Sequence, residues 1–191
     1  MKKHLFLILF LIQTGSLMAQ DGLPPQLEGK MMYPVIDISP WVGVFKIEPN
    51  ALKYDPKIEY KVAVDIYDKM KDSTAMNGAL LEVARTFNLL VANGAPQEKV
   101  KVAAVIHAES VLSILTDEAY IEKYGIINPT LPLIAKLKEA GVELFVCGQN
   151  VGFYDFIPEQ ISPDVKIALS AKTALITLDQ MGYSFLNVSG N

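Results

Sequence analysis

The stretch Gly141-Val-Glu-Leu-Phe-Val-Cys-Gly-Gln-Asn150 runs from one glycine through an apolar strand to a cysteine and a second glycine. The segment before it has apolar residues at three- and four-residue spacing, which is typical of a helix, and Gly141 supplies the stop signal. A helix that ends on glycine and is followed at once by a buried strand is a common unit of α/β proteins. This stretch therefore predicts an α/β fold and places Cys147 where a strand runs into a turn.

The same alternation of strands and helices continues on both sides of this stretch. Strands are expected at five places: 61–67, 100–106, 142–146, 165–169 and 183–188. Helices are expected between them, the first capped by Ser73 or Thr74 and the last capped by Ser170. Because parallel neighbours need crossover helices, this pattern predicts a three-layer α/β/α sandwich around a mostly parallel five-stranded sheet. The pattern does not set the order of the strands.

The first 19 residues have the composition of a secretory signal peptide. Lys2 and Lys3 form a positively charged start, and an apolar run from Leu5 to Ile12 follows it. Such a run is too short to span a bilayer as a mature helix. We predict that residues 1–19 are a cleaved signal peptide and that the mature protein is periplasmic or secreted, with an uncleaved N-terminal anchor as the alternative.

Residues 20–59 differ in composition from the rest of the mature chain. They are rich in proline and show no sustained helical or strand period, so they are interpreted as an extended N-terminal arm. An apolar group within the arm is expected to pack on the domain or on a neighbouring subunit. This group consists of Trp41, Val42, Val44 and Phe45. Residues 60–191 are then expected to form one α/β domain.

The charge balance argues against nucleic acid as a partner. The chain has 17 basic and 21 acidic residues, and loss of the two lysines of the signal peptide leaves 15 basic residues. Phosphate binding needs clustered Lys and Arg, whereas this chain has one arginine, Arg85, and no basic stripe. The mature chain also has no uniformly apolar stretch of about 20 residues, so no membrane span is expected.

Several chemically active side chains follow the predicted strands. The carboxyl ends of parallel strands meet at one edge of a sheet, and ligands bind there. The residues expected at this edge are Asp65, Asp68, His107, Cys147, Gln149, Asn150 and Ser170. The two aspartates are also compatible with plain solvation, and His107 with a hydrogen-bonded structural role.

Cys147 is the one cysteine of the chain, so an internal disulfide is excluded. It is a buried filler, a crosslink between chains or a reactive sulfur. A thiolate is stabilised near a helix N-terminus or an imidazolium such as that of His107. Gly148 would let backbone N–H groups approach the sulfur, while Gln149 and Asn150 could donate hydrogen bonds to a bound anion.

Other common chemistries lack their motifs in this sequence. A single cysteine with His107 does not make a closed zinc site, and neither a phosphate-binding glycine loop nor a serine nucleophile elbow is present. A Cys-His hydrolase normally needs a third group to orient the histidine, and the sequence does not identify one securely. We therefore expect no metal and no cofactor.

Five segments carry a resemblance to a known family. They are Val102-Ala-Ala-Val-Ile-His107, Asn128-Pro129, Leu137 to Gln149, Val165 to Leu175, and Gly182-Tyr183. Over roughly residues 60–188 the chain resembles the DsrE/DsrF-like family of sulfur-relay proteins. The resemblance implies that Cys147 is the position at which sulfur-carrying members accept sulfane sulfur as a persulfide and pass it to a partner thiol, without a cofactor. It also implies a homotrimer or hexamer.

Three features depart from the family pattern. Ala108 stands where members often have glycine after the strand-end histidine, the second cysteine of some members is missing, and the chain carries a predicted export signal. An RNA-thiolating role is therefore not expected. The sequence predicts a sulfurtransferase-like carrier with Cys147 and His107 at its reactive centre and Gly148, Gln149, Asn150 and Ser170 around it. Its partners would be a sulfur donor or acceptor protein or a small sulfane-sulfur compound. The alternative is a non-catalytic, oligomeric ligand- or partner-binding module in which Cys147 is structural.

Overall fold

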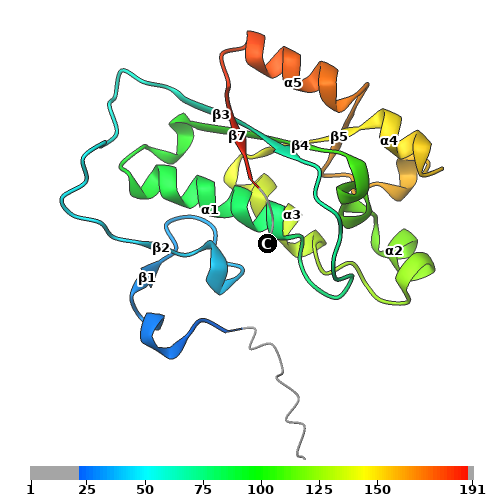
Figure 1. Ribbon diagram of the computed structural model, residues 1–191, viewed down its shortest axis with the longest axis horizontal. Coiled ribbons are helices and arrows are strands. Elements are labelled where there is room, and N and C mark those ends of the chain that lie inside the picture. The colour runs from blue at the N-terminus through cyan, green and yellow to red at the C-terminus, as the bar shows by residue number, and fades with distance from the viewer. Residues whose placement is uncertain (1–21, 189–191) are drawn as a thin grey trace, which may run out of the picture.

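The structure is a computed structural model that describes residues 22–188, so the predicted signal peptide lies outside the described residues. Its centre is a five-stranded sheet in which every neighbouring pair is parallel (Figure 1). The strands are β3 (Tyr60–Ile66), β4 (Val100–Ile106), β5 (Glu143–Cys147), β6 (Lys166–Ala168) and β7 (Ser184–Asn187), in the order β6-β5-β4-β3-β7. The predicted parallel five-stranded sheet is confirmed.

Helices cover both faces of this sheet. They are α1 (Gly78–Ala92), α2 (Asp117–Tyr124), α3 (Leu131–Ala140), α4 (Gly148–Phe153) and α5 (Ala171–Gln180). Figure 1 shows α1 and α3 below the sheet and α5 above it, which confirms the three layers. Short 3-10 segments complete the elements: η1 (Pro25–Leu27), η2 (Pro40–Val42), η3 (Gln97–Lys99), η4 (Ala108–Ile114) and η5 (Pro158–Gln160).

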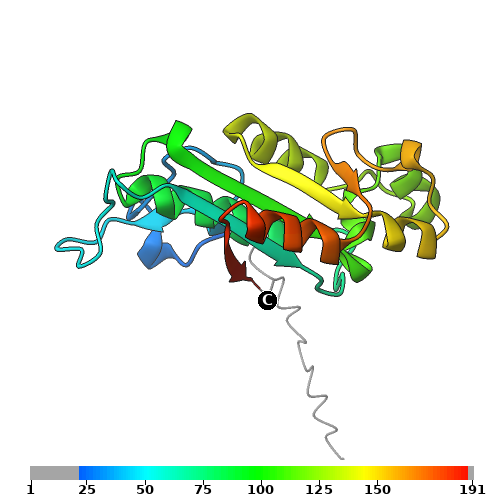
Figure 2. The same ribbon diagram turned by 90° about the horizontal axis from the view of Figure 1, so that it is seen from above.

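The two faces of the sheet bury different amounts of apolar surface. Alternate strand residues such as Val64 and Ile66 point to α1 and α3 and belong to the larger core cluster. The opposite face is built on small residues, including Ala63 and Ala103, and forms a minor cluster beneath α5. Figure 2 looks onto this face and shows stretches of β4 and β5 that α5 does not cover. The side of the sheet that packs against α5 therefore has the smaller hydrophobic core.

The start of α1 corrects one prediction. The helix begins at Gly78 and its cap is Asn77, whose Oδ1 accepts a hydrogen bond from the Leu80 N–H at 3.0 Å, so the prediction of Ser73 or Thr74 as the cap was wrong. Asp72 accepts hydrogen bonds from the backbone and hydroxyl of Thr74 and so forms a local turn instead. Asp and Ser or Thr side chains make such turns as readily as they cap helices.

A second correction concerns the segment after β5. The sequence predicted a turn after Cys147, whereas the structure has the one-and-a-half-turn helix α4. The segment Gly148-Gln-Asn-Val-Gly-Phe153 contains two glycines, which lower intrinsic helix propensity and conceal the helix in the sequence. Packing of α4 against β5 and η4 holds it in place.

The proline-rich segment lies against α1. Strands β1 (Met31–Met32) and β2 (Val44–Phe45) pair in an antiparallel ribbon, and Val42 and Val44 are buried. Asn88 of α1 is also fully buried and hydrogen bonds to the backbone of this segment. Trp41 and Phe45 remain 50% and 41% exposed.

Within residues 22–188, no helix combines the length and the apolar character that a membrane crossing needs.

Tyr120 of α2 provides a pH-dependent prediction. Its hydroxyl donates to the Ser73 carbonyl at 2.9 Å, and burial raises the pKa of Tyr120 to about 12. Since the ordinary tyrosine pKa is about 10, the protonated hydroxyl stabilises the fold fully below that pH and progressively less as pH rises through about 10 to 12. We expect Tyr120→Phe to lose about 1 kcal/mol of unfolding free energy at neutral pH, and this difference to shrink at alkaline pH. Urea unfolding at several pH values would measure it, and a pH-independent difference would contradict the prediction.

Candidate functional site

The carboxyl ends of the central strands bring His107 and Cys147 together. The ladder between β4 and β5 pairs Ile106 with Val146, so the next residues on each strand are His107 and Cys147. Neighbouring strands lie about 5 Å apart. Both residues fall on the α5 face, because Val105 and Phe145, two positions earlier on each strand, belong to the minor cluster beneath α5.

Cys147 lies in an apolar environment. It is 5% exposed and packs in the minor cluster together with Val105, Ala171 and Leu178. It also pairs in register with Ala168 of β6. Within the part of the chain that the structure describes, no side chain offers the thiol a hydrogen bond. The sulfur is therefore held by packing, directly beside the first turn of α5.

His107 has a carboxylate partner. Its Nε2 lies 2.9 Å from Asp65 Oδ1, and the side chains of His107 and Asp65 are 25% and 29% exposed. The Tyr67 ring lies beside the imidazole with centroids 5.5 Å apart, and the Tyr67 hydroxyl accepts a hydrogen bond from Asn187 at 3.4 Å. Sequence reasoning placed Asp65 at this edge but did not pair it with His107. The period-two alternation of β3 indicates the sheet face on which Asp65 lies, but the pairing with His107 also needed the strand order, which makes β3 and β4 neighbours.

Asn150 joins the two strand ends. Its Oδ1 accepts the Ala108 N–H at 3.1 Å, which links the residue after His107 to helix α4. Ala108 has φ of 51°, a left-handed conformation that favours glycine. The amide of Asn150 is therefore used to hold the backbone beside the site.

This backbone conformation makes Ala108→Gly a stabilising substitution. A left-handed alanine costs roughly 1–2 kcal/mol, and the greater unfolded-state entropy of glycine offsets part of that gain. We expect a net rise in unfolding free energy of up to about 1 kcal/mol, measured by denaturant unfolding. Asp155→Gly, at φ of 59°, should gain less because Asp tolerates this region better. A loss of stability in Ala108→Gly would contradict the assigned strain.

Gly148 and Gln149 face β6. A Cβ on Gly148 would lie 2.7 Å from the Ala168 carbonyl oxygen, so only glycine lets α4 start this close to β6. Gln149 donates from Nε2 to the Leu169 carbonyl at 3.2 Å. Ser170 caps α5 and exchanges hydrogen bonds with Thr173 at 3.1–3.2 Å. These three residues shape the β6 side of the edge, and their side chains or backbone are already engaged.

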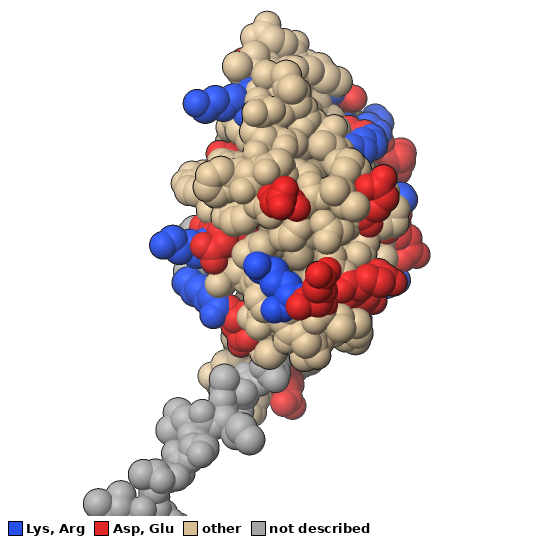
Figure 3. All heavy atoms as spheres, turned by 90° about the vertical axis from the view of Figure 1, so that its right-hand side faces the viewer, with Lys and Arg blue, Asp and Glu red and all other residues tan. Residues whose placement is uncertain are grey.

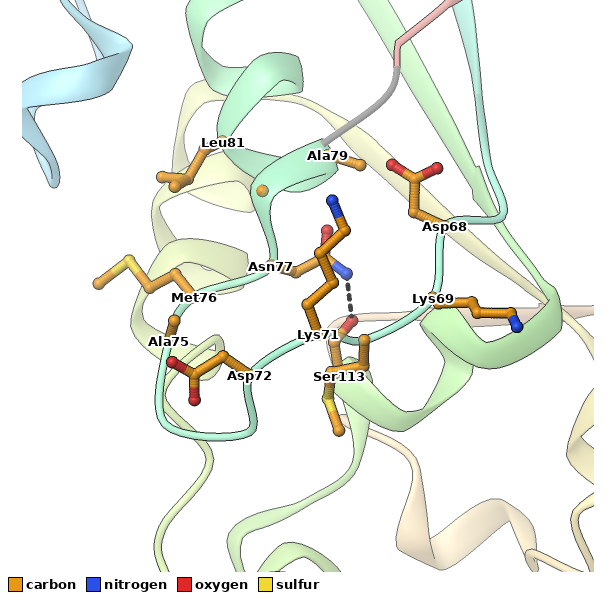
Figure 4. A pocket seen from close by; sticks show the side chains of 12 residues that line it. Asp68, Lys69, Lys71, Asp72, Ala75, Met76, Asn77, Ala79, Leu81 and Ser113 are labelled. Atoms are coloured by element: carbon orange, nitrogen blue, oxygen red, sulfur yellow. Dashed lines mark hydrogen bonds between the residues drawn. The ribbon is translucent and has the colours of Figure 1, made fainter. Parts of the chain in front are cut away.

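A separate cavity of about 210 Å³ lies at the start of α1 (Figure 4). The loop after β3 surrounds it with charges of both signs, from Asp68, Lys69, Lys71 and Asp72. On its inner wall Asn77 donates from Nδ2 to Ser113 Oγ at 3.1 Å. The sequence did not predict this cavity. Its walls come from residues 68–81 and from Ser113 of η4, so it forms only when this segment packs against η4.

Charged side chains gather unevenly on the side of the molecule that bears α4. Figure 3 views this side and shows Lys, Arg, Asp and Glu in its lower half and along its upper edges, with an uncharged area in the upper middle. Exposed apolar residues of α4 and the following loop include Phe153 and Ile157, which are 80% and 56% exposed.

Among residues 22–188 no group of three His, Cys, Asp or Glu side chains is placed to hold a metal ion.

The sheet and its edge define a class: parallel α/β proteins with a single thiol at the end of a central strand. A family model described as DsrE/DsrF-like matches residues 61–188, and the chain belongs to that family. The match begins at the second residue of β3 and leaves the proline-rich segment outside it. The resemblance inferred from the sequence is thereby confirmed.

A solved structure has the same fold. A protein of unknown function from Methanobacterium thermoautotrophicum, MTH1491, aligns with a TM-score of 0.50 and 16% sequence identity. The alignment covers 68% of this chain and 99% of that one. At this identity the likeness concerns the fold alone. A search of curated proteins finds no match.

Proposed function

We propose that this protein is an exported carrier of sulfane sulfur that holds the sulfur as a persulfide on Cys147. The observation that carries the proposal is the position of Cys147. It ends a central strand within the family match, next to His107 across the strand register. Membership of the family supports a role of the sulfur-relay type.

The proposed chemistry is a pair of thiol exchange steps. The Cys147 thiolate attacks the outer sulfur of a donor persulfide, so that a new S–S bond forms, the donor S–S bond breaks, and the donor leaves as a thiolate. An acceptor thiolate then attacks the outer sulfur on Cys147 and regenerates the Cys147 thiolate. Each step transfers one sulfur without net oxidation, and neither needs a metal or an organic cofactor.

The residues around Cys147 support the separate parts of this chemistry. His107 would take the thiol proton before the attack and return it to the departing thiolate. The apolar packing of Cys147 beneath α5 would keep water away from a bound persulfide. Gly148, Gln149, Asn150 and Ser170 would keep β5, β6, α4 and α5 in register around the sulfur rather than bind the donor directly.

Intact mass spectrometry tests the proposal. The full chain is incubated with polysulfide, excess donor is removed, and the mass is measured beside that of Cys147→Ser. We expect a gain of whole sulfur atoms that dithiothreitol reverses and that the variant lacks. A folded wild-type protein that gains no sulfur, or a Cys147→Ser variant that gains as much, would defeat the assignment.

The burial of Cys147 favours one second candidate. With 5% exposure the cysteine has the surroundings of a packed structural residue, and the protein would then be a non-catalytic binding module. Iodoacetamide separates the two functions. A thiol that reacts at neutral pH in the folded protein supports the carrier, whereas a thiol that reacts only after unfolding supports the binding module.

The location and the assembly are part of the same proposal. Cleavage after residue 19 would deliver the protein to the periplasm or the exterior, and the N-terminal sequence of the exported protein would show the cut. A homotrimer or hexamer is expected from the family resemblance, and sedimentation that finds only a monomer would contradict it. The donor and acceptor are a partner protein or a small sulfane-sulfur compound.

A further inference from the structure

We propose that Asp65 is a positioning residue that holds the His107 ring with its proton on Nε2, so that Nδ1 is the nitrogen that exchanges protons at the Cys147 edge. The role of this arrangement in sulfur transfer rests on the proposed function of Cys147. The ring tautomer itself does not depend on that function and can be measured separately.

The contact between the two side chains sets the tautomer. Asp65 Oδ1 lies 2.9 Å from His107 Nε2, which is a hydrogen-bond distance. An ionised carboxylate can only accept a hydrogen bond, so Nε2 must carry the proton. In a neutral imidazole the lone pair then resides on Nδ1. The carboxylate therefore selects the nitrogen that remains available as a base.

Two further contacts restrict the ring. The backbone N–H of His107 donates to the Ile66 carbonyl at 2.8 Å, which fixes the start of the side chain beside β3. The Tyr67 ring packs on the imidazole at 5.5 Å between centroids and an interplanar angle of 36°. Tyr67 is in turn held by the hydrogen bond from Asn187. The imidazole is thus restrained by a hydrogen bond and by packing.

The strand order explains why Asp65 positions the ring and does not touch the sulfur. Asp65 belongs to β3 and Cys147 to β5, and these strands lie on opposite sides of β4, which ends next to His107. Asp65 therefore binds the imidazole from the side away from Cys147. When Nδ1 accepts a proton, the carboxylate stabilises the imidazolium, as the aspartate does in an Asp-His pair of a hydrolase.

The tautomer is tested by long-range proton–nitrogen NMR of the full chain at alkaline pH, because a ring nitrogen that carries a proton and one that does not give distinct signals. The chain has two histidines, His4 and His107, and a spectrum of His107→Gln assigns the signals. We expect the wild type to show protonated Nε2 and unprotonated Nδ1 for His107. Asp65→Asn should show a mixture of tautomers because an amide can donate as well as accept. Asp65→Glu should restore part of the wild-type pattern.

Sulfur uptake provides the second readout. Carboxylates that orient metal-ligating histidines typically contribute 10–100-fold to activity, and we expect a comparable effect on this orienting contact, with uptake by Asp65→Asn roughly tenfold slower. Asp179→Asn makes the same chemical change at an exposed position of α5 and should leave the rate unchanged. Circular dichroism and denaturant unfolding of each variant would separate a slower reaction from a failure to fold.

The outcomes distinguish this inference from the proposed function. An unchanged His107 tautomer in a folded Asp65→Asn variant, or an unchanged rate of sulfur uptake in it, would overturn the positioning role while sulfur transfer by Cys147 stood. A wild-type protein that takes up no sulfur would overturn the proposed function. The NMR measurement would then still decide whether Asp65 sets the ring.

Discussion

Replacing Asn88 with alanine should release the proline-rich segment from α1 and lower the free energy of unfolding by about 3–5 kcal/mol. Asn88 is fully buried, and its amide makes four hydrogen bonds to the segment. Oδ1 accepts from the N–H groups of Val35 and Ile36 at 3.2 and 3.0 Å, and Nδ2 donates to the carbonyls of Ile36 and Val42 at 2.8 and 2.9 Å. Alanine would leave all four backbone groups without this partner, and each buried unsatisfied group costs about 1–3 kcal/mol.

Two measurements would check the Asn88→Ala prediction. Denaturant unfolding gives the loss of stability, and limited proteolysis with N-terminal sequencing shows whether residues 22–59 become accessible. Leu89→Ala is the matched control, because Leu89 follows on the same helix and is 45% exposed. Its effect should be well under half of that of Asn88→Ala. Equal losses in the two variants, or a segment that stays protected in Asn88→Ala, would contradict the assigned role.

Gly148→Ala should destabilise the edge at Cys147 by about 2–3 kcal/mol. The added Cβ would meet the Ala168 carbonyl oxygen at 2.7 Å and the Ile167 Cγ2 at 3.3 Å. Since a backbone oxygen cannot move aside alone, either β6 separates from β5 or α4 shifts. Cys147 pairs with Ala168, so either movement exposes the thiol.

The Gly148→Ala prediction has a control within the same helix. Gly152 also lies in α4, but nothing comes within 4 Å of a Cβ placed there. Gly152→Ala should be neutral or slightly stabilising because alanine has the higher helix propensity. We expect iodoacetamide to modify folded Gly148→Ala faster than folded Gly152→Ala. Similar unfolding midpoints for the two variants would show that β6 tolerates the extra methyl group.

The fold was largely predictable because its signals are local. Gly125 and Gly141 end their helices in the left-handed conformation, with φ angles of 75° and 94°, as the glycine stop signals predicted. Ser170 caps α5 as expected, and each predicted strand lies within one or two residues of its observed bounds. The cap of α1 was wrong because Asp72, Thr74 and Asn77 all have side chains that can serve a turn or a cap, and packing selects between them.

The candidate site was predictable only in part. Alternation along a strand and the end of that strand are sequence properties, so His107 and Cys147 could be placed at one edge. The Asp65 partner required the order of the strands, which places β3 beside β4. The engagement of Asn150 with Ala108 and of Gly148 with Ala168 required the helix α4, which its glycines concealed.

The sequence by itself determined the alternation of strands and helices, the parallel sheet, the family and the single thiol at a strand end. These follow from local propensity, periodicity and composition, which act over a few neighbouring residues. Only the tertiary structure decided that Asp65 holds His107, that Asn88 fastens the proline-rich segment and that Cys147 is buried beneath α5. Those features join residues far apart in the chain, and the contact that decides each one exists only after the sheet and its helices have packed.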